Sequence, residues 1–104
     1  MRITGKLELD RFCEKYTECS YRSSFQEWHD RVKESKWNKP SDVIKTFNSA
    51  DPNCRTKNGS KICIFNTICG SRLICTINFN KRIVKIQEAL THIEYEKNKW
   101  KDRY

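Results

Sequence analysis

The sequence predicts an α+β fold, in which a short strand and two helices precede an antiparallel sheet of three or four strands and a short C-terminal helix. In the N-terminal third, apolar residues recur at the spacing of one helix face. From residue 61 to residue 90 this spacing changes to short runs rich in Ile, Val, Phe and Thr, which favour strands. A chain of 104 residues can bury one modest core, so residues 1–104 are expected to form a single domain.

Two helices are predicted before residue 40. The first follows a strand expected at Arg2–Thr4, and the second is predicted to begin at Ser23, where Gln26 three residues later completes a capping box. Both helices should cover the sheet with an apolar face at the i, i+3, i+4, i+7 spacing. These faces are formed by Leu9, Phe12, Cys13 and Tyr16 in the first helix and by Phe25, Trp28 and Val32 in the second.

The middle of the chain is predicted to be mainly loop. Asp42–Lys45 add one helical turn after Pro40. The stretch Asn48–Ser60 contains turn-forming residues in Asp51-Pro52-Asn53 and in Lys57-Asn58-Gly59-Ser60. It is therefore predicted as a loop without a strand.

Three strands are predicted after this loop, at Lys61–Asn66, Arg72–Asn78 and Ile83–Leu90. Between them, Cys69-Gly70-Ser71 and Asn80-Lys81 have the composition of hairpin turns. Strands joined by such short turns pair antiparallel. The two helices are then expected to cover one face of the resulting sheet.

The C-terminal segment begins with a second capping box, formed by Thr91 and Glu94. His92 is expected at the first helical position and Tyr95 at the fourth. Beyond them the tail is mostly charged, with Trp100 as its one clear anchor.

Charge and cysteine content narrow the classes of function. With 21 basic and 13 acidic residues, the formal net charge is 21 − 13 = +8. This favours a polyanionic partner such as nucleic acid or an acidic protein, and charge that serves solubility alone is the alternative. No signal peptide and no apolar run of membrane-spanning length is visible, so a cytoplasmic location without membrane contact is expected. The six cysteines show neither a CxxC pair nor zinc-type spacing with His, so they are assigned to packing, with no metal or other cofactor.

His92 and Tyr95 are candidate proton-transfer residues. Three residues apart on a helix, their Cβ atoms are roughly 5–6 Å apart, so both side chains can contact one substrate group. The positive field of the helix N-terminus and of nearby lysines is expected to keep the imidazole neutral, the form that removes a proton from a ribose 2′-OH. Spacing alone favours the alternative, in which both rings pack against the sheet.

Arg72 is the candidate phosphate ligand, because a guanidinium matches two phosphoryl oxygens and stabilises the charge of a pentacoordinate phosphorane. The alternative is a surface ion pair with Glu88. Arg55, Lys57 and Lys61 alternate with small polar residues and are candidates for binding an RNA backbone. A solvated loop would have the same composition.

Several reaction classes lack their motifs in this chain. The three glycines lie far apart, so no phosphate-binding glycine loop is present. No paired carboxylates and no Ser–His–acid arrangement stand out. NTP hydrolysis, glycosidase and esterase chemistry are therefore excluded.

Four segments of the chain resemble the HigB-type toxins of the RelE/ParE superfamily. In order, they are Trp37-Asn38-Lys39-Pro40-Ser41-Asp42-Val43-Ile44, Phe65-Asn66, Arg72-Leu73-Ile74 and Thr91-His92-Ile93-Glu94-Tyr95. The resemblance covers nearly the whole chain, and its last segment is the most specific. It implies a RelE-like fold and a toxin of a type II toxin–antitoxin pair, typically an endoribonuclease that cuts mRNA on the ribosome. It also implies a HigA-type antitoxin with a helix-turn-helix domain. Operator DNA would be bound by this antitoxin, and by the toxin only indirectly through it.

The resemblance also implies roles for individual residues. Arg72 matches the strand arginine that contacts the scissile phosphate. His92 and Tyr95 match C-terminal positions credited with acid–base or orienting roles. Lys57 and Lys61 fall where related toxins place RNA-contacting basic residues.

Two positions depart from the family pattern. The family usually has an aromatic residue just before the strand arginine, in a slightly longer hairpin, where this chain has Ser71. This difference can shift Arg72 or remove a surface on which a base stacks. After the tyrosine the family commonly has Asp, where this chain has Glu96.

The sequence thus predicts a ribosome-dependent endoribonuclease that cleaves mRNA on the 70S ribosome by metal-independent transesterification. Arg72, His92 and Tyr95 would form its catalytic site. The alternative is a non-catalytic growth inhibitor that binds RNA, the ribosome or DNA on the same scaffold. A gyrase-poisoning toxin is a third possibility.

Overall fold

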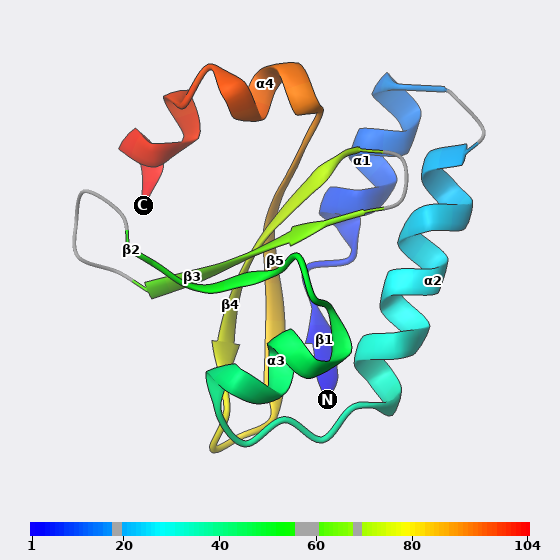
Figure 1. The fold of residues 1–104 in the computed structure, drawn as a ribbon. Helices are drawn as coiled ribbons and strands as arrows, with labels where there is room; N and C mark the ends of the chain where they lie inside the picture. The colour runs from blue at the N-terminus through cyan, green and yellow to red at the C-terminus, as the bar shows by residue number, and fades with distance from the viewer. Residues whose placement is uncertain (18–19, 56–60, 68–69) are drawn as a thin grey trace.

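The described part of the chain folds around a five-stranded sheet in the order β1-β5-β4-β3-β2 (Figure 1). The computed structural model describes residues 1–17, 20–55, 61–67 and 70–104, with Arg55 described in its backbone only. The strands are β1 (Arg2–Thr4), β2 (Asp51–Arg55), β3 (Lys61–Asn66), β4 (Arg72–Asn78) and β5 (Ile83–Leu90). Strands β2 to β5 pair antiparallel with their neighbours, whereas β1 pairs parallel with β5.

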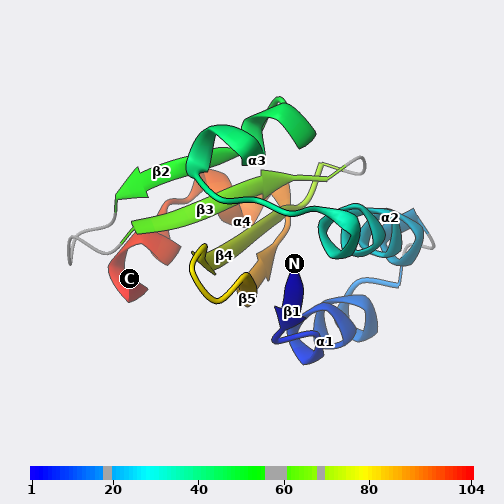
Figure 2. The same ribbon diagram turned by 90° about the horizontal axis from the view of Figure 1, so that it is seen from below.

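Helices cover both faces of this sheet. On one face lie α1 (Leu7–Lys15), α2 (Ser20–Glu34) and α3 (Pro40–Thr46). The C-terminal segment, with α4 (His92–Glu96) and the 3₁₀ helix η1 (Lys99–Arg103), lies on the other face. Figure 2 shows α1 and α2 on the opposite side of the sheet from the C-terminal segment. The α+β class is therefore confirmed.

Each face of the sheet has its own core, because successive side chains along a strand point to opposite faces. The strand residues of the helix-side core are Cys63, Phe65, Leu73, Cys75, Val84 and Ile86. They pack against Leu9, Phe12, Phe25, Trp28, Val32 and Val43 of the helices. The second core is formed by Ile62, Ile64, Ile74, Leu90 and Trp100. The apolar faces predicted for both helices thus pack into the helix-side core, with Tyr16 only partly buried.

The strand predicted at Arg2–Thr4 and the three strands predicted after residue 60 are confirmed with their bounds. The loop predicted at 48–60 is wrong in part. Asp51–Arg55 form β2, an edge strand that pairs with β3 and contains an irregularity between Asp51 and Cys54. Pro52 is tolerated there because an edge strand does not need its missing N–H. The Asp51 carboxylate accepts a hydrogen bond from the Asn53 N–H (3.2 Å), so the turn-forming residues occupy an irregular edge strand. The turn predicted at Lys57–Ser60 lies outside the described residues.

The start predicted for the second helix is also wrong. Helix α2 begins at Ser20, so Ser23 lies inside it, and the Gln26 amide donates to Asp30 (2.9 Å) one turn further on. The additional N-terminal residues include Tyr21, whose ring lies 4.9 Å from that of Phe12. Packing of this ring stabilises a longer helix than the local capping signal predicts.

Gly5 lies in the short connection between β1 and α1, where the backbone passes close to β5. Its φ is +83°, and a Cβ at this position would lie 2.3 Å from the carbonyl oxygen of Ile86. Gly70 has nearly the same φ, +84°, but no described atom lies within 4 Å of its Cβ position. The two glycines therefore share one backbone conformation and differ in the space around it.

We expect Gly5→Ala to destabilise the protein much more than Gly70→Ala. A left-handed φ costs an L-residue about 1–2 kcal/mol at either site, and only Gly5→Ala adds a collision with the backbone of β5. Urea denaturation of the two variants and the parent protein measures the difference. Equal losses of unfolding free energy would show that the close approach of Gly5 to the Ile86 backbone does not restrict the side chain at position 5.

Candidate functional site

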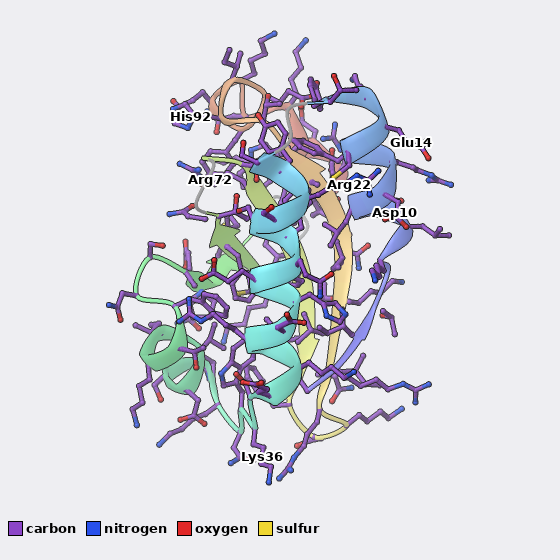
Figure 3. All side chains as sticks on the ribbon, turned by 90° about the vertical axis from the view of Figure 1, so that its right-hand side faces the viewer. Asp10, Glu14, Arg22, Lys36, Arg72 and His92 are labelled. Carbon is purple, nitrogen blue, oxygen red and sulfur yellow. The ribbon has the colours of Figure 1, made fainter. Side chains whose placement is uncertain are left out.

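Strand register brings Arg72 to the C-terminal helix. Arg72, the first residue of β4, lies opposite Leu90, the last residue of β5. The chain leaves the sheet directly after Leu90 and enters α4 at His92. Arg72 and His92, twenty residues apart in sequence, therefore meet at one end of the sheet, where both are labelled in Figure 3.

The predicted cap at Thr91 is confirmed and orients α4. The Thr91 hydroxyl accepts a hydrogen bond from the Glu94 N–H (3.1 Å), and the Glu94 carboxylate accepts one from the Thr91 N–H (3.1 Å). The same carboxylate oxygen accepts a hydrogen bond from the Tyr16 hydroxyl at the end of α1 (3.1 Å). Glu94 is thus engaged at the cap and with α1.

Arg72 and Glu96 contact the two nitrogens of the His92 ring. Nη2 of Arg72 lies 3.3 Å from Nδ1, while Nη1 donates to the Gly70 carbonyl (2.6 Å). Oε1 of Glu96 lies 3.5 Å from Nε2. A guanidinium can only donate, so Nδ1 is the acceptor and the ring proton is assigned to Nε2, facing the carboxylate. In this arrangement the Nδ1 lone pair faces the guanidinium and the Nε2–H faces the carboxylate.

Tyr95 completes the group from one helical turn further along. The Arg72 guanidinium lies 5.3 Å from the centroid of the Tyr95 ring. The ring also stacks on Trp100 (5.3 Å between centroids, 11° between planes), whose indole N–H donates to the Tyr95 carbonyl (3.0 Å). Burial raises the pKa of the Tyr95 phenol and outweighs the opposing charge of Arg72. Tyr95 therefore keeps its proton at neutral pH and can donate a hydrogen bond.

The three predicted residues lie together on an open surface. The His92 side chain is 57% exposed, and Arg72 and Tyr95 are half-buried. The alternative ion pair between Arg72 and Glu88 is not formed. Glu88 instead accepts hydrogen bonds from both Arg103 and the Tyr104 hydroxyl, so the tail has anchors in addition to Trp100.

The predicted RNA-binding residues lie apart from this group where they are described. Lys61 is exposed at the first position of β3, and Asn66 at the end of that strand is the residue opposite Arg72. Lys61 and Asn66 are five residue steps apart along the strand, a separation of about 17 Å. The Arg55 side chain and all of Lys57 lie outside the described residues.

Ser71, the first departure from the family pattern, lies inside the hairpin that precedes β4. It is 1% exposed, its hydroxyl contacts that of Thr67, and its carbonyl accepts a hydrogen bond from the Thr67 N–H (3.0 Å). An aromatic ring would not fit this buried position without movement of the hairpin. Arg72 nevertheless contacts His92 and Tyr95, so the serine does not displace the arginine.

Sequence reasoning missed two residues of the site. In the sequence, Glu96 stands out only as a substitution for Asp, but the i, i+4 spacing that places helical side chains side by side brings it into contact with His92. The sequence predicts Trp100 as an anchor of the tail, but its stacking on Tyr95 has no signal in the sequence.

Among the residues that the structure describes, no three His, Cys, Asp or Glu side chains are grouped so that they could hold a metal ion. Within the same residues, no helix is both long and apolar enough to cross a membrane.

The cap of α4 should make stability depend on pH. Burial alone raises the pKa of Glu94, but the hydrogen bonds from Thr91 and Tyr16 and the charge of Lys15 outweigh it and hold the pKa below its ordinary value of 4.5. The stabilisation is therefore complete above pH 4.5 and is lost as the pH falls through the lower folded-state pKa. We expect Glu94→Gln to be less stable than the parent protein at neutral pH, and this difference to shrink in acid. Thermal unfolding from pH 7 to pH 3 measures it, and a constant difference would contradict the role of the ionised carboxylate.

Comparison of the sequence with known proteins identifies the family of this chain. No curated protein matches the chain. Residues 21–98 match the family model of the HigB toxin, described as the RelE-like toxic component of a toxin–antitoxin system. This span contains Arg72, His92 and Tyr95 and exceeds half of the 104-residue chain. The protein therefore belongs to the HigB toxin family and is the RelE-like toxic component of a toxin–antitoxin system.

Proposed function

We propose that this toxin is an endoribonuclease that cleaves mRNA on the ribosome by metal-independent transesterification. The observation that carries the proposal is the position of the Arg72 guanidinium, which contacts Nδ1 of His92 and faces the Tyr95 ring. A cation, a neutral imidazole and a protonated phenol at one point are the groups that phosphodiester transesterification needs.

The reaction moves one proton and exchanges one P–O bond for another. A scissile phosphate binds Arg72 and draws its Nη2 away from His92, which frees the Nδ1 lone pair. Nδ1 then accepts the proton of the ribose 2′-OH, and the 2′ oxygen attacks phosphorus. Arg72 stabilises the phosphorane, and Glu96 stabilises the imidazolium through Nε2–H. The 5′ oxygen leaves and is protonated by the imidazolium, with Tyr95 donating a hydrogen bond that orients the group. The products are a 2′,3′-cyclic phosphate and a 5′-OH.

The exposure of His92 supports the dependence on the ribosome. A site that is open to water gives weaker electrostatic stabilisation than one from which water is excluded. With His92 57% exposed, the protein by itself excludes little water from the reacting phosphate. An mRNA held on the 70S ribosome would supply both the covering surface and the substrate geometry.

The family also implies an antitoxin partner. We infer that this partner is a HigA-type protein with a helix-turn-helix domain, which represses the toxin and connects it to operator DNA. The toxin, acting in the cytoplasm, would not bind that DNA itself.

Substitutions at the three residues should separate their roles. We expect Arg72→Ala to slow cleavage by about 10²–10³-fold through loss of charge stabilisation. His92→Ala should slow it by about 10²–10⁴-fold. Tyr95→Phe keeps the ring that stacks on Trp100 and should have the smallest effect. Single-turnover cleavage on programmed ribosomes measures these rates, with Arg11→Ala on the exposed face of α1 as the matched arginine control.

The alternative, non-catalytic inhibitor makes the opposite prediction for growth. If Arg72→Ala combined with His92→Ala still arrests growth as strongly as the parent toxin, then binding rather than cleavage is the toxic activity. Arg11→Ala should remain toxic in either case.

The chemistry of the cut ends tests the proposed reaction directly. We expect a 2′,3′-cyclic phosphate or its 3′-phosphate hydrolysis product on one fragment and a 5′-OH on the other. An mRNA with a single 2′-deoxy nucleotide at the cleavage position should bind but remain intact, because the attacking oxygen is absent. Continued cleavage of that mRNA, or 5′-phosphate ends, would rule out the mechanism.

A further inference from the structure

The end of the sheet opposite Arg72 and His92 gathers basic side chains from separate parts of the chain. We call this surface the basic end. It comprises Arg2 in β1, Lys33 and Lys36 at and just after the end of α2, and Lys81 and Arg82 in the turn between β4 and β5. All five side chains are exposed. Figure 1 shows the N-terminus beside the β4–β5 turn, and Figure 3 shows Lys36 at the opposite end from His92.

Main-chain contacts hold these segments together. The Arg2 N–H donates to the Arg82 carbonyl (2.7 Å), which joins β1 to the turn. The amino group of Met1 donates to the Lys33 carbonyl (3.2 Å), which joins β1 to the end of α2. Burial lowers the pKa of this amino group, and the positive charges of Arg82 and Lys36 lower it further. The basic side chains thus surround one small region.

These charges have no acidic partners in the described structure. Among the described residues, none of the five basic side chains lies within 4.0 Å of a carboxylate. Elsewhere Arg11 pairs with Glu8, and Arg103 pairs with Glu88. An uncompensated cluster of positive charges attracts a polyanion more strongly than the same charges in ion pairs.

The composition of the basic end favours phosphate over other anionic partners. The exposed large apolar residues of the described chain are Leu7, Ile44 and Ile93, and none belongs to this cluster. A protein partner normally requires an apolar centre from which lysine is depleted. Single-stranded RNA is usually bound by exposed aromatic rings, whereas Phe79, the aromatic residue of the adjacent turn, packs against the helix-side core. Cationic side chains alone suffice for the backbone of a nucleic-acid double helix.

We propose that the basic end is a second RNA-binding surface, which contacts the phosphate backbone of double-helical RNA without reading its sequence. Strand β5 runs from this surface to the Arg72–His92 site, and its eight residues separate the two by about 23 Å. Both surfaces can therefore be occupied at once by different RNA segments. The proposal concerns binding and does not depend on whether the protein cleaves RNA.

The test uses a fluorescently labelled RNA duplex in which every ribose is 2′-O-methylated, so that it cannot undergo transesterification. Binding is measured by anisotropy over a range of salt concentrations. The variant Lys36→Gln with Arg82→Gln removes two charges from the basic end. The matched control, Lys6→Gln with Arg22→Gln, removes an exposed lysine directly before α1 and an exposed arginine of α2. Circular dichroism checks that both variants are folded.

We expect the basic-end variant to lose affinity and the slope of log K against log salt to fall by about 2, close to one unit for each lost phosphate contact. The control should keep the parent slope, and Lys36→Arg should keep the parent affinity. Equal losses in the two double variants would mean that net charge alone drives binding and would overturn the proposal. So would an absence of duplex binding at low salt, or binding of poly-glutamate instead of RNA through Lys36 and Arg82.

Discussion

The pairing of Arg72 with Leu90 is the constraint on which the site depends. Because α4 starts two residues after Leu90, any change in this register would move the arginine away from His92. A slip by one residue would also turn Arg72 to the helix-covered face and place Leu73 on the other, exchanging buried and exposed residues. Burial of Leu73 and Ile74 on opposite faces therefore holds the register, and with it the contact between the guanidinium and the imidazole.

The C-terminal segment has two roles that cannot be separated. It covers the second core with Trp100, and it presents His92 and Tyr95 to Arg72. Tyr95 belongs to both, since its ring packs on Trp100 and faces the guanidinium. The buried Trp100 indole thus supports the Tyr95 ring. Because of this support, the exposed side chains of the site keep one geometry.

The two ends of the strands carry two different kinds of surface. At one end, Arg72 and Glu96 contact the two ring nitrogens of His92, and the ring proton is assigned to Nε2 from these contacts. At the other, the side chains of the basic end stay exposed and have no described acidic partner. The positive charge that gives the protein its net charge of +8 is therefore not spread evenly over the surface. The proposed RNA-binding surface and the proposed catalytic site can share one small sheet because each uses a different end of the strands.

Arg72, His92 and Tyr95 became candidates through their chemistry together with the family resemblance, and their roles remain a prediction. Local signals were enough to predict the apolar helix faces, four of the strands and the cap at Thr91. These features depend on periodicity and on hydrogen bonds between residues close in sequence, which the chain encodes directly. Strand β2 and the early start of α2 were missed because their stability comes from pairing and packing with distant residues. The same reason applies to the site. The sequence indicates which side chains form the candidate site. Strand register and the packing of Trp100 bring them into contact, because they join segments that are distant in sequence and that no local sequence pattern connects.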